Sequence, residues 1–173
     1  MNPVDDPGRD SFDAWVRAAQ SRLLKSAFLM TGDAHYAQDL VQDVLVKVAA
    51  RWEKLRDENP DGYARRILYR DRVSWWRRSR EFPVEVMPEG SPRDLSESSV
   101  DYLVVGAALE RLTRKQRAVL VLRYFDDLTE RQTADILGVS VGTVKSQCSA
   151  ALTRLRKVAP ELAAFKFGGA SDV

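Results

Sequence analysis

The chain is poor in the residues that bind metals and form cross-links. Among its 173 residues there is one cysteine, Cys148, and one histidine. One cysteine cannot form an internal disulfide, and these two residues cannot supply the four ligands of a structural zinc site. The sequence also lacks a glycine-rich phosphate loop and paired metal-binding carboxylates beside a histidine. We therefore expect no disulfide, no metal, no cofactor and no enzymatic activity such as that of a nuclease or phosphotransferase.

Long apolar runs and strand-like alternation are missing as well. No apolar stretch approaches the ~20 residues that span a bilayer. The N-terminus is acidic and contains proline, unlike a signal peptide, so we expect a cytoplasmic protein with no membrane contact. Apolar residues recur at helical spacing throughout, which predicts an all-α fold. The length is compatible with one ordinary domain, but two small helical domains fit the pattern better.

The first predicted domain covers residues 11–80. Its first helix starts at about Ser11 and stops at residues 31–33. A strongly amphipathic helix follows, with apolar residues three and four apart from Ala37 to Trp52. After a loop over residues 53–59, Asn59 and Pro60 are a natural cap and first residue for a third helix.

A flexible acidic linker is predicted over residues 81–99, which contain three prolines, one glycine and four serines without a helical period. The second domain is predicted over residues 100–160, followed by a short tail. The domain is expected to be compact, and Thr113 is expected to cap its second helix with Gln116 as its capping-box partner. The first helix is expected to contain the apolar residues Leu103, Val104, Ala107, Ala108 and Leu112.

The stretch from Leu128 to Ser146 predicts two short helices joined by a tight turn, a helix-turn-helix. Thr129 and Gln132 form a capping box at the first helix, and Gly138 supplies the left-handed residue that ends it. Ser140 is placed to cap the second helix. The buried side is expected to contain Ala134, Ile136 and Leu137 in the first helix and Val144 and Cys148 in the second, with Leu128 packed beneath the motif.

The outward face of the second helix is mostly small, polar or basic, as a helix that enters a DNA major groove requires. The alternative is an ordinary helical corner in a core. The predicted duplex-binding residues are Ser140, Val141, Gly142, Thr143, Lys145, Ser146 and Gln147.

Residues 61–80 contain seven arginines against two aspartates, whereas the following segment is acidic. Arginines neutralise phosphates and interleaved aromatic rings stack on unpaired bases, so this helix is predicted to bind single strands or separate a duplex. The alternative is a solvated basic face with tryptophans partly in the core. The predicted melting residues are Arg66, Tyr69, Arg70, Trp75, Trp76, Arg77 and Arg78.

The polar side of the amphipathic helix contains Asp39, Gln42 and Asp43, with the apolar Val46 among them. A solvated face would explain the polar residues alone. The presence of Val46 slightly favours a protein-binding surface.

The order of segments along the chain resembles that of bacterial RNA polymerase sigma factors of the extracytoplasmic-function group, most closely those of actinobacteria. These segments are residues 37–48, the arginine- and tryptophan-containing helix within residues 61–80 (the Arg/Trp helix), the acidic linker, residues 112–125 and the helix-turn-helix. The resemblance covers about residues 11–158. It implies a sigma region 2 and a sigma region 4 that contact the β′ clamp and the β flap of core polymerase, and it allows an anti-sigma factor as a further partner. Asp39, Leu40, Gln42, Asp43 and Val46 would dock on the clamp.

The resemblance also assigns promoter DNA to three segments. The loop over residues 53–59 and the Arg/Trp helix would engage the melted minus-ten element, and the helix from Val141 would read the minus-thirty-five element. The alternative function is a stand-alone helix-turn-helix regulator that binds a palindromic site as a dimer. That alternative leaves the acidic linker and the Arg/Trp helix without a role.

Overall fold

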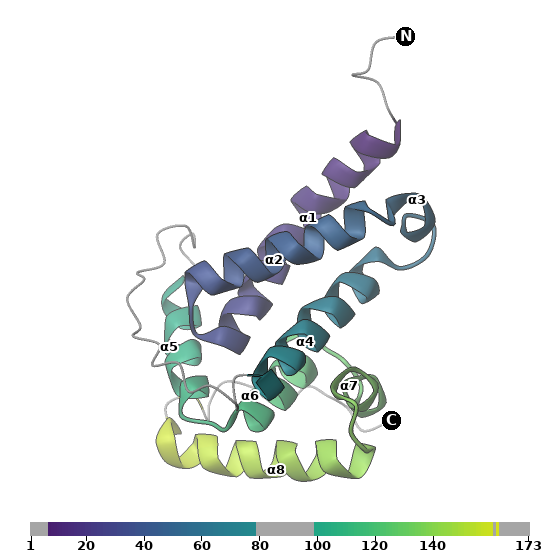
Figure 1. Cartoon of the computed structure of the whole chain (residues 1–173). Helices are drawn as coiled ribbons and strands as arrows, with labels where there is room; N and C mark the ends of the chain where they lie inside the picture. The colour runs from purple at the N-terminus through teal and green to yellow at the C-terminus, as the bar shows by residue number, and fades with distance from the viewer. Residues whose placement is uncertain (1–6, 79–98, 161, 163–173) are drawn as a thin grey trace. The chain divides into compact units, whose positions relative to one another are not determined.

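The computed structural model describes residues 7–78, 99–160 and 162, and all regular structure in these ranges is helical (Figure 1). The chain divides into two compact units, residues 1–27 with 35–89 and residues 28–34 with 90–173. The predicted all-α fold class with two helical domains is confirmed. The predicted linker lies almost wholly outside the described residues. Within the described ranges, none of the helices combines the length and the apolar character that crossing a bilayer requires.

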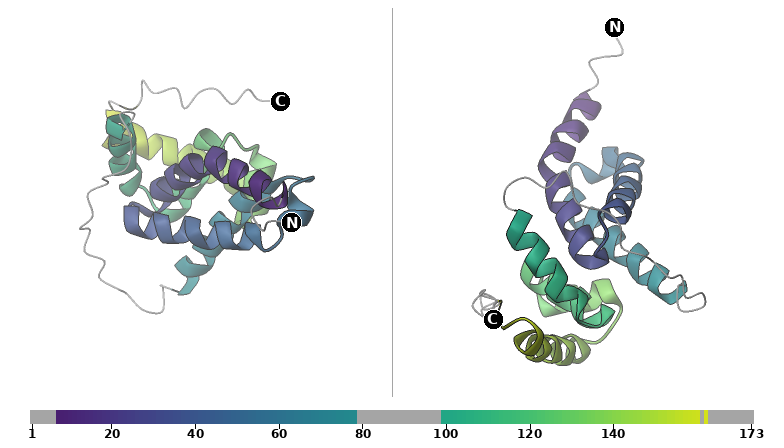
Figure 2. Two further views of the ribbon diagram at one scale, coloured as in Figure 1. Left: turned by 90° about the horizontal axis from the view of Figure 1, so that it is seen from above. Right: turned by 90° about the vertical axis from the view of Figure 1, so that its left-hand side faces the viewer.

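Residues 7–78, as the structure describes them, form three long helices and one single turn of helix: α1 (Pro7–Thr31), α2 (Ala34–Ala49), α3 (Trp52–Leu55) and α4 (Pro60–Arg78). The views in Figures 1 and 2 agree that α1 and α2 lie side by side. Trp52 was predicted to close the second helix, but α2 ends at Ala49 and Trp52 begins α3. The helical spacing continues across this break, so spacing alone could not locate it.

The amphipathic pattern of α2 correctly predicts its buried face. Residues three and four apart share one side of a helix with 3.6 residues per turn. The whole predicted set within α2 is buried: Ala37, Leu40, Val41, Val44, Leu45 and Val48.

Local signals also set the helix ends near these elements. Gly32, with φ +73°, follows the last residue of α1, and its N–H donates to the Phe28 carbonyl at 2.7 Å. At the start of α4 the Asn59 side-chain oxygen accepts from the Gly62 N–H at 2.8 Å, and Pro60 is the first helical residue. The predicted cap at Asn59 and Pro60 is confirmed.

Over the described residues from 99 onward, the helical elements are α5 (Ser99–Glu110), α6 (Arg114–Leu120), the π-helical turn η1 (Val121–Phe125), α7 (Glu130–Leu137) and α8 (Val141–Val158). Helix α8 packs on both α6 and α7. The predicted capping box at α6 is present. Thr113 Oγ1 accepts from the Gln116 N–H at 3.3 Å, and the Gln116 side chain accepts from the Thr113 N–H at 3.2 Å.

The apolar residues expected on the first helix of this domain differ in their exposure. Leu103 and Val104 are 40% and 43% exposed, and Ala107 is exposed too, whereas Ala108 and Leu112 are buried. The helix also ends at Glu110, so Leu112 follows it. Apolar residues occur on every side of this short helix, and its spacing therefore does not select one face.

Two arginines join the ends of α5 and α8. Arg111 follows α5 and donates from Nη1 to the Val158 carbonyl at 2.7 Å, while Arg154 in α8 donates from Nε to the Arg111 carbonyl at 2.7 Å. The last carbonyls of a helix have no partner within the helix, and cationic donors also suit its negative end. This reciprocal pair holds the C-terminal end of α8 against the end of α5.

The π-helical turn was not predicted. It widens the backbone between α6 and α7, with the Asp126 N–H donating to the Val121 carbonyl at 3.0 Å. The Leu128 N–H then donates to the Leu122 carbonyl at 3.0 Å, and the Arg123 side chain donates to the Leu128 carbonyl. These bonds bring Leu128, which is half-buried, to the start of α7.

Candidate nucleic-acid interface

The helix-turn-helix of α7 and α8 has the three predicted caps. Thr129 Oγ1 accepts from the Gln132 N–H at 3.2 Å, and the Gln132 side chain accepts from the Thr129 N–H at 2.9 Å. Gly138 adopts φ +66° after α7. Ser140 Oγ accepts from the Thr143 N–H at 3.1 Å at the start of α8. Each bond joins residues a few positions apart, which explains why the sequence alone located them.

A small apolar cluster fixes the crossing of the two helices. Val144 is fully buried against Ala134 and Val119, and the half-buried Leu137 and Cys148 pack on this cluster. Because Ala134 has only a methyl group, the two helices can approach closely. The predicted inner residues of α8 are confirmed.

Two further residues complete this inner side. Ile136, predicted to be buried, is half-buried. Thr133, which the apolar pattern did not include, is fully buried, and among the described residues its hydroxyl has no hydrogen-bond partner. Burial of a hydroxyl without a hydrogen bond costs about 1–3 kcal/mol of folding free energy, so Thr133 lowers the stability of α7.

Cys148 contacts Tyr124 of the π-helical turn. The thiol donates to the Tyr124 hydroxyl at a sulfur–oxygen distance of 3.6 Å. Burial, with the thiol contact as a second cause, raises the pKa of Tyr124 to about 12. The contact joins the inner side of α8 to the π-helical turn.

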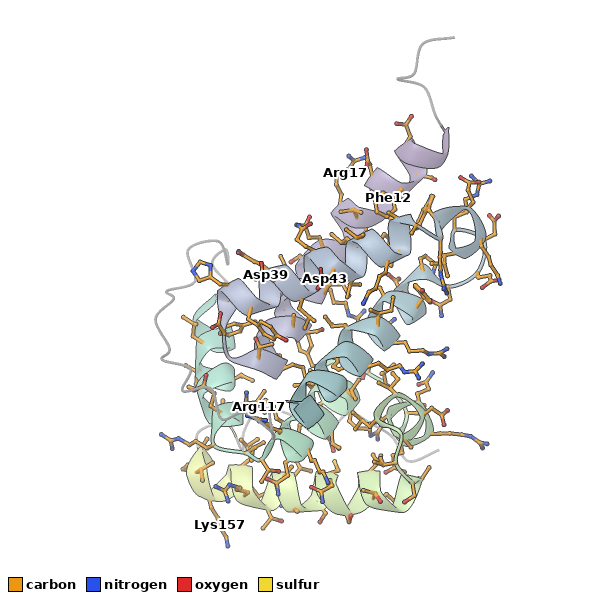
Figure 3. All side chains as sticks on the ribbon, in the orientation of Figure 1. Phe12, Arg17, Asp39, Asp43, Arg117 and Lys157 are labelled. Carbon is orange, nitrogen blue, oxygen red and sulfur yellow. The ribbon has the colours of Figure 1, made fainter. Side chains whose placement is uncertain are left out.

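The outer side of α8 presents the predicted duplex-binding residues at its N-terminal end. Five are exposed, Ser140, Val141, Gly142, Lys145 and Ser146, whereas Thr143 and Gln147 are half-buried. Lys145 Nζ lies 3.6 Å from a carboxylate oxygen of Glu130 in α7, and 65% of the lysine side chain is exposed. At the other end of α8, Arg156 and Lys157 are exposed, the latter labelled in Figure 3.

Comparisons with known proteins match both parts of the chain. Residues 15–82 match the family model of sigma-70 region 2, and residues 102–155 match that of sigma-70 region 4. The chain is 40% identical over 149 residues to the RNA polymerase sigma-E factor of Streptomyces coelicolor, a match that covers 84% of each chain. The chain belongs to the sigma-70 family. The resemblance seen in the sequence is confirmed.

Other similar proteins place this sigma factor in the extracytoplasmic-function group. The extracytoplasmic-function sigma factor SigL of Mycobacterium tuberculosis is 33% identical over 150 residues, covering 81% of this chain and 84% of SigL. Among solved structures, the sigma factor RpoE of Bartonella quintana, crystallised with the anti-sigma factor NepR, has a TM-score of 0.69 at 27% identity. That match covers 85% of this chain and 95% of RpoE. CnrH, solved with the cytosolic domain of CnrY, shares the fold, with a TM-score of 0.57 at 21% identity and coverage of 87% and 88%.

The protein is therefore a sigma factor that binds core RNA polymerase for transcription initiation, and it is not an enzyme. Its region 4 binds DNA. The alternative of a stand-alone regulator is set aside because region 2 is present as well as the helix-turn-helix.

In the sigma factor's region 2, α2 exposes most of the predicted polymerase-binding residues. Asp39 and Asp43 lie one turn apart on the same side of the helix (Figure 3), Gln42 is exposed beside them, and Val46 is 67% exposed. Leu40 must be removed from this set. It is 6% exposed and belongs to the buried face of α2.

The predicted melting residues on α4 differ in their solvent exposure. Arg66 and Arg70 are exposed. Tyr69 is fully buried, so its ring is a core residue and cannot stack on a base as predicted. Its position between Leu68 and Arg70 on a helix with mixed polarity left its orientation undecided. The side chains of Trp75, Trp76, Arg77 and Arg78 lie outside the described residues.

Proposed function

We propose that the N-terminal half of α8 reads the minus-thirty-five element of the promoter in the major groove. The observation that carries this proposal is the complete helix-turn-helix, whose outer face combines small and polar residues with one exposed lysine. Small residues let the helix approach base edges, whereas polar and cationic groups bond to bases and phosphates. Seven residues form the proposed contact: Ser140, Val141, Gly142, Thr143, Lys145, Ser146 and Gln147.

Region 2 is proposed to supply the main contact with core polymerase and to capture the melted strand. Asp39, Gln42, Asp43 and Val46 would dock on the β′ clamp, because they form an exposed, largely acidic patch around one apolar side chain. Region 4 would dock on the β flap.

The exposed segment over residues 53–59 and the basic face of α4 would engage the minus-ten element. Unstacking costs a few kcal/mol per base step, which polymerase binding and base capture must offset. The residues of α4 in this proposal are Arg66, Arg70, Trp75, Trp76, Arg77 and Arg78.

An anti-sigma factor is a further proposed partner, supported by the likeness to RpoE in its complex with NepR. A protein that co-purifies with the tagged chain and competes with core polymerase for binding to it would support an anti-sigma partner.

We also propose a cytoplasmic location, where core polymerase and promoter DNA are found.

Lys145 and Glu130 provide a test of the role of α8, because their variants should act in opposite directions. Lys145→Ala removes one phosphate contact and is expected to flatten the log–log salt dependence of duplex binding by about one unit. Glu130→Gln frees Lys145 and removes a negative charge beside the phosphates, so duplex affinity is expected to rise by a few-fold, within the ~1 kcal/mol typical of exposed pairs. The measurement is duplex binding by the holoenzyme over a range of salt concentrations.

Lys157→Ala is a matched control, since this exposed lysine lies at the far end of α8. It should retain the preference for the minus-thirty-five sequence. An unchanged salt slope in Lys145→Ala would remove the phosphate contact from the proposal. A fall in affinity for Glu130→Gln would show that the carboxylate supports binding.

A second test concerns duplex opening. Replacement of both Trp75 and Trp76 by alanine is expected to leave polymerase binding and closed-complex formation largely intact but to impair transcription from linear duplex. A template with a pre-melted bubble supplies the unstacking energy from outside and should restore much of the activity. Equal impairment on both templates would assign the two tryptophans to the core or to docking.

A further inference from the structure

Three aromatic rings from two parts of the sequence meet in region 2. Phe12 and Trp15 come from the N-terminal part of α1, where Figure 3 labels Phe12, and Trp52 begins α3. Trp52 lies 5.2 Å from Phe12 in an edge-to-face arrangement and 5.5 Å from Trp15, measured between ring centroids. Trp52 is buried, whereas the other two rings are half-buried. Such ring contacts stabilise the cluster beyond the burial of the rings alone.

Both indole N–H groups of this cluster make hydrogen bonds. Trp52 Nε1 donates to Ser11 Oγ at 2.9 Å, and Ser11 Oγ in turn donates to the Gly8 carbonyl at 2.8 Å. Trp15 Nε1 donates to Asp61 Oδ1 at 3.0 Å. Trp52 opens α3 and Asp61 lies in the first turn of α4. The N-terminal part of α1 is therefore hydrogen-bonded to residues on both sides of the segment 53–59.

The segment between these two anchors is exposed and polar. Over residues 53–59 only Leu55 is buried. Arg56 lies between two exposed carboxylates, 3.3 Å from Glu53 and 3.7 Å from Asp57, so the segment presents charges of both signs. Residues 53–59 thus expose hydrogen-bond donors and acceptors, and the residues on either side of them are hydrogen-bonded to α1.

We propose that Ser11 and Trp15 are positioning residues for recognition of the minus-ten element. Their hydrogen bonds to Trp52 and Asp61 fix the two residues that flank residues 53–59. The position and orientation of this segment relative to α4 therefore depend on Ser11 and Trp15. Discrimination between bases requires recognition groups to be held within about 0.5 Å, and supporting hydrogen bonds provide this precision. The inference rests on the proposed role of residues 53–59 at the minus-ten element.

The test uses holoenzyme assembled from the full chain and core polymerase. Trp15→Phe keeps an aromatic ring but removes the N–H donor, and Ser11→Ala removes the acceptor for Trp52. Transcription is measured on promoters in which each minus-ten position is varied in turn. The double variant is expected to lose about three- to ten-fold of the discrimination between preferred and altered bases, since one of the two lost hydrogen bonds joins neutral groups and the other, to the Asp61 carboxylate, is exposed to solvent.

Three controls separate positioning from a general structural role. Core polymerase affinity is expected to stay within about two-fold of the original, because neither substitution touches the exposed side of α2. Ser21→Ala, an exposed serine on the same helix, should leave base discrimination unchanged. Asp61→Asn retains a side-chain oxygen that accepts from Trp15 and should preserve more discrimination than Asp61→Ala, which provides a second test if the double variant unfolds.

Several outcomes would overturn the proposal. Unchanged base discrimination in a folded, polymerase-binding double variant would do so, as would equal losses from Asp61→Asn and Asp61→Ala. Arg56→Ala tests the segment itself. A loss of base discrimination in Arg56→Ala alone would support the role of residues 53–59 at the minus-ten element but reject the positioning role of Ser11 and Trp15. No loss in any variant would reject both roles.

Discussion

Asp43→Arg is expected to weaken the binding of core polymerase by at least about 100-fold while the protein stays folded. Asp43 is exposed on α2, opposite the buried residues of that helix. Exposed substitutions usually change the free energy of unfolding by no more than ~0.5 kcal/mol. A reversed charge within a complementary interface costs several kcal/mol, since attraction is replaced by repulsion. The measurement is the Kd for core polymerase, with circular dichroism as the check on folding.

Asp13→Arg is the matched control for this charge reversal. Asp13 is an exposed aspartate on α1 and lies outside the proposed docking patch. Its variant should bind core polymerase with nearly the original affinity. Equal weakening by both variants would indicate a long-range effect of net charge, and an unchanged Kd for Asp43→Arg would remove α2 from the interface.

Val144→Asp is expected to unfold the helix-turn-helix and abolish binding to the minus-thirty-five element. The side chain at this position is fully buried against Val119 and Ala134. A carboxylate there has no charged partner in the cluster, and burial of an unpaired charge belongs to the few substitutions that exceed about 4 kcal/mol. Chemical denaturation followed by circular dichroism measures the loss of stability, and duplex binding measures the loss of recognition.

Val141→Asp separates folding from recognition in the same helix. Val141 is 38% exposed at the first position of α8, where a negative charge suits the helix dipole. This variant is expected to fold normally but to bind duplex more weakly, since the carboxylate would face phosphates. A Val144→Asp protein with the original denaturation midpoint would contradict the packing described for α7 and α8.

The sequence was most informative where the structure depends on neighbours along the chain. Thr129 and Gln132 cap each other across three residues, and Gly138 needs only its own backbone freedom to end α7. Both features join residues that are close in the sequence, so they can be predicted without knowing how the helices pack. The same holds for the two predicted partners of the capping box at α6, Thr113 and Gln116.

Surface exposure was harder to predict when a helix has no dominant apolar stripe. Tyr69 is fully buried although the helix around it is basic, whereas Leu103 and Val104 are exposed although they are apolar. In α2 the stripe is continuous, so the exposed residues there could be predicted. The error at Leu40 arose because a residue of the stripe was also assigned to the docking surface.

By itself the sequence determined the helical class, the two regions, the helix-turn-helix and the likeness to sigma factors, because these depend on spacing and on short-range caps. Only the tertiary structure decided that Trp52 opens a separate helical turn and that α1 is bonded through Ser11 and Trp15 to both ends of residues 53–59. It also decided the π-helical turn and the pairing of Lys145 with Glu130. The physical reason is that the contacts between separate elements, over 46 residues for Trp15 and Asp61, depend on how the helices pack and leave no periodic signal along the chain.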